Sequence, residues 1–123
     1  MNIFISGGAG FIGSHLSKKL IESNDVDSLV IYDNFSSGTM SHLSELVNST
    51  RVKIKNADIK NLAELTHAMR DCDLVVHFAA NPDIAKAVSQ PDIDFWEGTF
   101  LTQNILEAMR VNGVRKILYT SGI

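Results

Sequence analysis

Glycines crowd a short stretch near the amino end of the chain, and their spacing could serve to bind phosphate. They follow an apolar run at residues 2–6, precede a segment of helical periodicity, and occupy positions Gly7, Gly8, Gly10 and Gly13. The early glycines permit a tight turn and let a phosphate approach the backbone, while Gly13 lets the helix pack closely on the strand. The N–H groups and the dipole at the start of that helix favour negative charge. The stretch therefore predicts a pyrophosphate-binding turn.

A glycine spacing of this kind is specific only in its context. Gly8, Gly10 and Gly13 satisfy G-x-G-x-x-G between a predicted strand and a predicted helix, which is the setting of a dinucleotide-binding fingerprint. The alternative is a purely structural glycine-rich turn. The sequence Gly-Lys-Ser/Thr does not occur in the chain, which excludes a P-loop nucleotide triphosphatase on motif grounds.

An acidic residue stands where such a site would need one. Asp33 lies twenty residues after Gly13, at the end of a second apolar run at residues 28–32. A carboxylate there can accept hydrogen bonds from both hydroxyls of an adenine ribose, and it would repel a 2′-phosphate. Because residues 34–50 contain no Arg or Lys, the pattern favours NAD over NADP. Alternatively, Asp33 only starts a turn with Asn34.

Strands and helices alternate along the chain. Short apolar runs predict five strands, at residues 2–6, 28–32, 52–55, 73–78 and 116–120. Helical spacing predicts a helix after the glycines, a short one around 41–47, and further helices at 61–70 and 92–112, the last stopped by Gly113. We therefore expect an α/β, Rossmann-like doubly wound parallel sheet with strand order 3-2-1-4-5.

Composition excludes several classes of function. With 123 residues, 45% of them hydrophobic, the chain can bury one core, so we expect one domain over residues 1–123. A net charge of -3 with scattered basic residues disfavours nucleic acid. Neither a membrane span nor a signal peptide is evident, so we expect a soluble, cytoplasmic protein. The histidines lie in no ligand-like cluster and predict no metal site. Cys72, between Asp71 and Asp73, is expected to be unreactive.

Six blocks of the chain resemble the NAD-dependent epimerase/dehydratase family, the extended short-chain dehydrogenases/reductases that act on nucleotide sugars. They are Ser-Gly-Gly-Ala-Gly-Phe-Ile-Gly (6–13), Tyr-Asp-Asn-Phe-Ser-Ser-Gly (32–38), Ala-Asp-Ile (57–59), His-Phe-Ala-Ala-Asn-Pro (77–82), Asn-Ile-Leu-Glu-Ala-Met-Arg (104–110) and Tyr-Thr-Ser (119–121). The blocks stand in the family's order and span the whole chain. The resemblance implies NAD as cofactor and a nucleotide sugar as substrate of the complete protein.

The resemblance also implies a set of cofactor-binding residues. Gly7, Gly10 and Gly13 would form the pyrophosphate turn, with Phe11 and Ile12 beside it. The adenine ribose would be surrounded by Asp33, Asn34, Phe35, Ser36, Ser37 and Gly38. Asp58 and Ile59 would contact adenine, and the nicotinamide side would be lined by Phe78, Ala79 and Ala80.

The sequence departs from the family at the catalytic residues. The family's Tyr-x-x-x-Lys motif does not occur, since Tyr32 is followed four residues later by Ser36 and Tyr119 by Ile123. We therefore expect an N-terminal portion that is inactive by itself, with the substrate-binding portion absent. Gly98 replaces the usual Asn of the long helix. Gly122 stands where a hydroxyl is expected, which leaves Ser121 as a displaced catalytic candidate or a turn residue.

Three functions remain open on these grounds. The first is the NAD-binding portion of a nucleotide-sugar epimerase or dehydratase, which transfers a hydride transiently to NAD. The second is a non-catalytic dinucleotide-binding or regulatory module, and the third is a reductase of the same family. Phe95 and Trp96 are interpreted as packing residues of the long helix, and an exposed aromatic patch is the alternative. Self-association or a homodimer is expected through that helix or through an exposed edge at residues 116–120.

Overall fold

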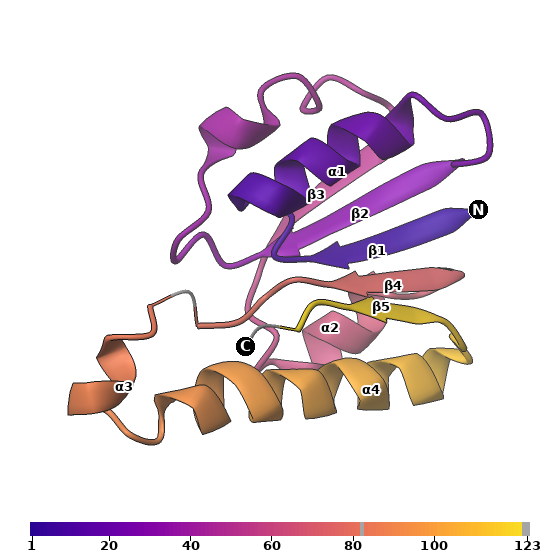
Figure 1. The fold of residues 1–123 in the computed structure, drawn as a ribbon. Coiled ribbons are helices and arrows are strands. Elements are labelled where there is room, and N and C mark those ends of the chain that lie inside the picture. Colours follow the sequence, from indigo (N-terminus) through magenta and orange to yellow (C-terminus); the bar gives the residue numbers. More distant parts are fainter. Residues whose placement is uncertain (82, 122–123) are drawn as a thin grey trace.

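The structure is a computed structural model that describes residues 1–81 and 83–121. Its strands form a five-stranded sheet in the order β3-β2-β1-β4-β5, and every pair of neighbours is parallel. Figure 1 shows β1 (Asn2–Ser6), β2 (Ser28–Asp33), β3 (Val52–Asn56), β4 (Leu74–His77) and β5 (Ile117–Tyr119). The predicted fold class and strand order are confirmed.

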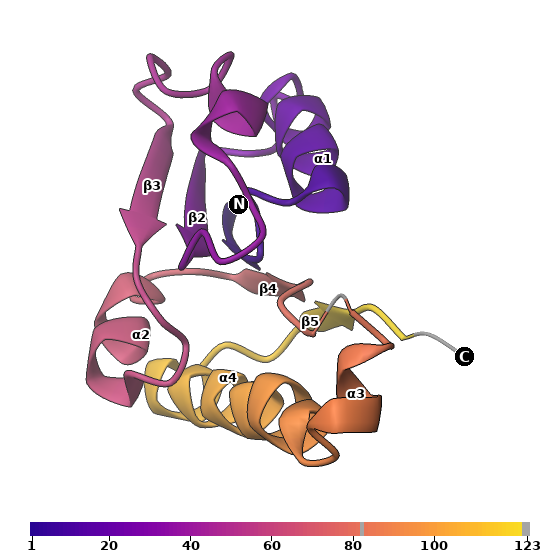
Figure 2. The same cartoon turned by 90° about the vertical axis from the view of Figure 1, so that its left-hand side faces the viewer.

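Helices cover both faces of this sheet. One face carries α1 (Phe11–Ile21) and the short 3₁₀ helix η1 (Met40–Leu43). The opposite face carries α2 (Leu62–Ala68) and α4 (Phe100–Asn112), as the edge-on view in Figure 2 shows. The order of elements along the chain therefore yields three layers, as expected for a doubly wound sheet.

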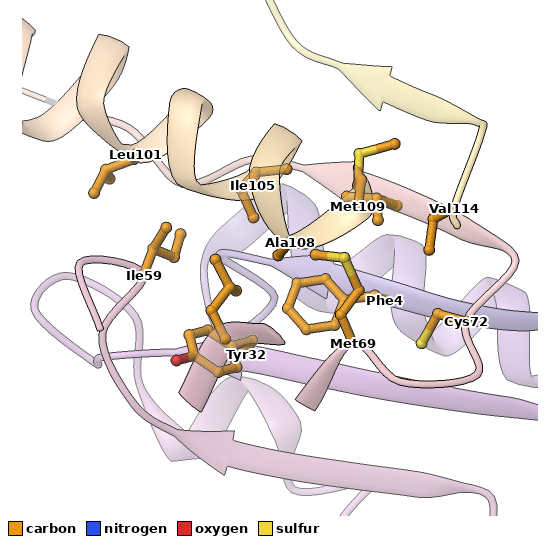
Figure 3. Packing of buried hydrophobic residues seen from close by; sticks show 12 residues of the cluster. Phe4, Tyr32, Ile59, Met69, Cys72, Leu101, Ile105, Ala108, Met109 and Val114 are labelled. Atoms are coloured by element: carbon orange, nitrogen blue, oxygen red, sulfur yellow. The ribbon is translucent and has the colours of Figure 1, made fainter. Parts of the chain in front are cut away.

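The central strand β1 supplies side chains to both layers. Ile3 and Ile5 are buried in a cluster that includes Leu16 and Leu20 of α1. Phe4, between them, is buried in a second cluster with residues of α2 and α4 (Figure 3). This alternation follows from the two-residue period of a strand. Because β1 is buried on both faces, its carboxyl end is firmly held, and the glycine turn begins there.

Two helix ends lie where the sequence predicts them. Asn61 caps α2 by accepting a hydrogen bond from the Glu64 backbone N–H at 3.2 Å. Gly113 ends α4 with a φ of 71°, in the left-handed region that glycine adopts without strain. Asparagine at the start of α2 and glycine after the end of α4 are residue types that favour these two positions.

The structure corrects the prediction of a helix around residues 41–47. Only Met40–Leu43 is helical, as a 3₁₀ turn. Leu43 and Leu46 are both buried against Ala9 and Ile31, and three-residue spacing places them on one side of a 3₁₀-like turn. The serines of this segment also bond locally, as in the 2.8 Å contact between the hydroxyls of Thr39 and Ser41. Local polar bonds and two apolar anchors therefore shape this segment.

The long helix predicted at residues 92–112 is present but less regular than expected. Helical backbone runs without a break from residue 93 to residue 112, and a π-helical turn, η2 (Phe95–Thr99), precedes the regular α-helix α4. Gly98 lies within η2. A short helix that the sequence pattern did not predict, α3 (Lys86–Ser89), lies before it.

The aromatic residues of η2 do not belong to the core. Phe95 and Trp96 are 51% and 47% exposed, and their rings contact each other edge-on with centroids 5.0 Å apart. Their interpretation as packing residues is therefore wrong, and the exposed-patch alternative describes them better. At the sheet edge, β5 pairs with β4, and Leu118 and Tyr119 are exposed. Self-association through either surface stays a prediction.

Candidate functional site

The glycine turn (residues 7–10) lies very close to α1 and to the segment after β4. Two glycines, Gly7 and Gly13, have no room for a side chain at these contacts. A Cβ on Gly7, whose φ is 71°, would lie 2.8 Å from the backbone nitrogen of Ala79. A Cβ on Gly13 would lie 2.5 Å from the carbonyl oxygen of Gly7. The Gly10 N–H closes the turn on that same oxygen at 3.2 Å. The start of α1 is therefore drawn close to the ends of β1 and β4.

A cleft of about 480 Å³ opens over this turn, at the carboxyl ends of the strands. Its lining includes Gly7, which follows β1, and Phe78, which follows β4. The strand order reverses between these two strands, and this is the usual ligand position in an open α/β sheet. Its volume lies within the range typical of small-molecule sites. We call it the switch-point cleft, and it is lined by Gly7, Gly10, Phe11, Ile12, Gly13, Tyr32, Asp33, Asn34, Ser36, Ser37, His42, Ala57, Asp58, Ile59, Phe78, Ala79, Ala80, Glu97, Leu101 and Thr120.

Most residues selected from the sequence come together in this cleft, although they derive from four separate blocks. The glycines and Phe11 and Ile12 form its floor at the start of α1, and both apolar side chains are exposed. The first N–H groups of any α-helix lack partners within the helix. The described side chains provide no cap at Gly10, so this helix start is open to a ligand.

Phe35 and Gly38 do not line the cleft, in contrast to the expectation for the 33–38 loop. Phe35 adopts a φ of 59° and packs against the cluster of Leu43 and Leu46. A Cβ on Gly38 would lie 2.8 Å from Ala9, so Gly38 supports the back of the glycine turn. Both residues thus shape the loop that presents its neighbours to the cleft.

Asp33 forms a local turn and also lies at the cleft, so its position is compatible with both roles that the sequence left open. Its Oδ1 accepts the Phe35 N–H at 2.8 Å, which is a local turn. Its Oδ2 accepts the Ala9 N–H at 2.9 Å, and the residue also lines the cleft. Each carboxylate oxygen has a second lone pair, so the group can still accept hydrogen bonds from a ligand.

Ser121 is not brought into the cleft, while its neighbour Thr120 is. Ser121 is exposed and absent from the lining, and Gly122 lies outside the described residues. The Thr120 hydroxyl donates to the His77 carbonyl at 3.4 Å, which places Thr120 at the end of β5 beside β4. Thr120, and not the candidate Ser121, is therefore the hydroxyl that lies at the cleft.

A buried histidine supports the Ala79 end of the cleft. His77 Nδ1 lies 2.5 Å from the Ser6 hydroxyl, which in turn accepts the Ala79 N–H at 3.3 Å. His77 Nε2 contacts the Thr102 hydroxyl of α4 at 3.2 Å. Burial lowers the pKa of His77 to about 4, so the ring is neutral near pH 7. It works as a neutral hydrogen-bonding link between β1, β4 and α4.

Several lining residues escaped the sequence interpretation. Leu101 lies one helical turn before Ile105, and Tyr32 and Thr120 adjoin selected residues, so periodicity or adjacency could have found them. Glu97 reaches the cleft rim, where it pairs with Lys60 of the β3–α2 loop. This pair joins segments far apart in the sequence, and no local signal marks it.

Other chemistry has less support among residues 1–81 and 83–121. These residues hold no group of three or more His, Cys, Asp or Glu side chains that could hold a metal ion. None of their helices is both long and apolar enough to span a membrane.

Burial, with Asp73 and Asp71 nearby, raises the pKa of the Cys72 thiol to about 11. A raised pKa agrees with the expectation that Cys72 is unreactive, and burial is its leading cause.

Comparisons with known proteins agree with this geometry. The chain matches the model of the NAD dependent epimerase/dehydratase family over residues 3–122. The UDP-glucose 4-epimerase of Halalkalibacterium halodurans is 33% identical over 122 residues, which make up 98% of this chain and 34% of the relative. The chain therefore spans about a third of the length of this curated relative.

Solved structures show the same arrangement. The UDP-glucose 4-epimerase of Thermotoga maritima, solved with UDP-glucose, gives a TM-score of 0.86 at 31% identity and covers 98% of this chain and 38% of that one. A dTDP-glucose 4,6-dehydratase of Streptomyces venezuelae, solved with NAD and TYD bound, gives 0.90 at 25% identity over 95% of this chain and 38% of that one. Because the family model covers nearly all of the chain and the folds coincide, this protein belongs to the NAD-dependent epimerase/dehydratase family.

Proposed function

We propose that this chain is the NAD-binding portion of an enzyme that epimerises or dehydrates a nucleotide sugar. The observation that carries the proposal is the convergence of the glycine turn, Asp33 and the Phe78–Ala80 segment on one cleft at the sheet's switch point. The relatives described above include an epimerase and a dehydratase, both acting on nucleotide sugars by name. Both activities belong to a family that depends on NAD, and binding of NAD is the role that we assign to this part of the chain.

The residues present fit a dinucleotide. Gly7 and Gly13 leave space at the turn that a Cβ would fill, and the open helix start at Phe11 offers N–H groups to a pyrophosphate. Asp33 would accept hydrogen bonds from the adenine-ribose hydroxyls and would repel a 2′-phosphate. Ala79 and Ala80 leave room for a nicotinamide ring at the opposite end of the cleft.

The chain's own contribution to the reaction is binding and orientation. Bound NAD would supply reversible hydride transfer with a carbon of the sugar. Neither described tyrosine fits the role of base. Tyr32 is buried and donates its hydroxyl proton to the Asp58 carbonyl, while Tyr119 lies outside the cleft lining and stacks on His77. Thr120, at the cleft, is placed to hydrogen-bond a substrate oxygen.

Calorimetric titration with NAD and with NADP tests this proposal. We expect NAD to bind more tightly than NADP, and Asp33→Ala to weaken NAD binding by about 10- to 100-fold, the value of one or two hydrogen bonds to a charged group. Asp25→Ala is a matched control, because Asp25 is exposed and does not line the cleft. A folded protein that binds neither dinucleotide, or equal loss of binding in both variants, would contradict the proposal.

A further inference from the structure

Two buried side chains hold consecutive carbonyl groups of the cleft wall. The Tyr32 hydroxyl donates to the Asp58 carbonyl oxygen at 2.9 Å, and the Asn104 side-chain amide donates to the Ile59 carbonyl oxygen at 2.9 Å. Tyr32 comes from β2 and Asn104 from α4. The segment that follows β3 is therefore clamped from two elements that lie on either side of it.

Both donors lie in apolar surroundings, so the loss of either hydrogen bond would leave a buried polar group without a partner. Tyr32 is fully buried and Asn104 is 7% exposed, and Tyr32 belongs to the same cluster as Ile59, Leu101 and Ile105 (Figure 3). A buried polar group without a partner is costly, so each donor strongly prefers the position of its acceptor. The backbone at Asp58 and Ile59 has correspondingly little freedom to shift.

The same segment positions the Asp58 carboxylate. Its Oδ1 accepts the Lys60 N–H at 2.9 Å, and the Asp58 carbonyl also accepts the Asn61 N–H at 3.1 Å. Asp58 lines the cleft, so its second carboxylate oxygen is available to a ligand. A carboxylate only accepts hydrogen bonds, and it therefore favours a base with an exocyclic amine over one with a carbonyl at the same position.

We propose that Tyr32 and Asn104 are positioning residues that set the base specificity of the cleft. They hold the backbone at Asp58 and Ile59, and thereby keep the Asp58 carboxylate where it accepts a hydrogen bond from the amine of adenine. The inference rests on the proposed binding of NAD. It adds two residues that act on base selection through the backbone of Asp58 and Ile59, and not through hydrogen bonds of their own to the base.

The chain offers a matched control on the same helix. Asn112 also lies on α4, and its side-chain amide donates to the Thr66 carbonyl of α2 at 2.9 Å. Asn112 and Thr66 do not line the cleft. Asn112→Ala therefore removes a link of the same length between an α4 asparagine and a backbone carbonyl of another element, together with a local bond to the Ala108 carbonyl, and leaves the cleft wall untouched.

The experiment measures the ratio of two dissociation constants, for nicotinamide hypoxanthine dinucleotide and for NAD. The two ligands differ in the exocyclic group at C6 of the base and in the proton on the adjacent N1. Titrations are run on the wild-type protein and on Tyr32→Phe, Asn104→Ala and Asn112→Ala, with thermal unfolding in parallel. We expect the wild type to prefer NAD, and Tyr32→Phe and Asn104→Ala to reduce that preference roughly five- to tenfold, as expected for one impaired hydrogen bond. Asn112→Ala should keep the wild-type ratio even where its melting temperature falls.

The outcomes separate this inference from the proposed function. Wild-type binding of NAD, with a ratio that stays unchanged in Tyr32→Phe and Asn104→Ala, overturns the inference alone. A wild type that does not distinguish the two bases overturns it as well. No NAD binding by the folded wild type overturns both. If Asn104→Ala does not fold, Tyr32→Phe decides the matter, because it removes a single hydroxyl and keeps the ring.

Discussion

The Asp33 carboxylate accepts a hydrogen bond from the Ala9 N–H at 2.9 Å, so the acidic residue at the end of β2 is tied directly to the glycine turn after β1. Its other oxygen accepts the Phe35 N–H. The residue expected to recognise a ribose therefore also fixes the two loops between which the ribose would lie. If Asp33 binds the ribose as proposed, one side chain would both recognise the ligand and pre-organise its site.

Asp33→Asn should separate these two roles. The amide oxygen can keep one backbone hydrogen bond, while the negative charge is lost and an NH₂ group replaces the second acceptor. We expect the NAD-over-NADP preference to fall about tenfold, and unfolding to become easier by about 1 kcal/mol. Titration with both dinucleotides and urea unfolding measure the two effects. An unchanged preference would show that Asp33 serves the loops only.

Gly13→Ala should destabilise the fold, whereas Gly98→Ala should not. The new Cβ at position 13 would lie 2.5 Å from the Gly7 carbonyl oxygen, a backbone atom that moves only with the whole turn. We expect a loss of about 2–3 kcal/mol of unfolding free energy, as for other overpacked sites, together with loss of NAD binding. A Cβ on Gly98 would meet nothing within 4 Å, so that variant is the control. Equal stability of the two variants would contradict the geometry of the turn.

His77 should make stability depend on pH. Burial lowers its pKa from 6.5 to about 4, so on acidification the unfolded chain binds a proton before the native one does. The stability that this site contributes is complete above about pH 6.5 and is lost as the pH falls toward 4, in total about 3 kcal/mol. Urea unfolding between pH 7 and 5 measures the slope. His77→Gln should flatten it, and a slope that survives the substitution would assign it to other groups.

Cys72 should react slowly in the native protein. Burial, reinforced by Asp73 and Asp71, raises the pKa of its thiol to about 11, and the thiolate is the reactive form. At pH 8 we expect modification by a thiol reagent to be roughly 100-fold slower in the native protein than in urea. Cys72→Ser gives the background rate. Rapid modification of the native protein would show that the core around Met69 and Val75 opens readily.

The regular parts of the fold could be predicted because their signals are local. β1 and β2 are apolar runs, and their predicted bounds agree with the structure to within one residue. Gly113 ends α4 because glycine adopts its left-handed conformation without strain. Residues 41–47 could not be predicted in the same way, because their buried leucines pack against Ala9 and Ile31 and outweigh a helical pattern. Over residues 92–112 the helix was predicted, but no local signal marks the π-helical turn at Phe95–Thr99.

The sequence by itself determined the chemistry available to this protein: a glycine-rich turn after β1, an acid at the end of β2, and two alanines, Ala79 and Ala80, shortly after β4. These depend on residue type and on spacing along the chain. Only the tertiary structure decided which residues share the cleft, since it brought Glu97 and Thr120 to the rim, left Ser121 outside, and packed the partly buried Phe35 against the cluster of Leu43 and Leu46. Such placements depend on contacts between segments distant in sequence, and the energy of burying a side chain is known only when its neighbours are.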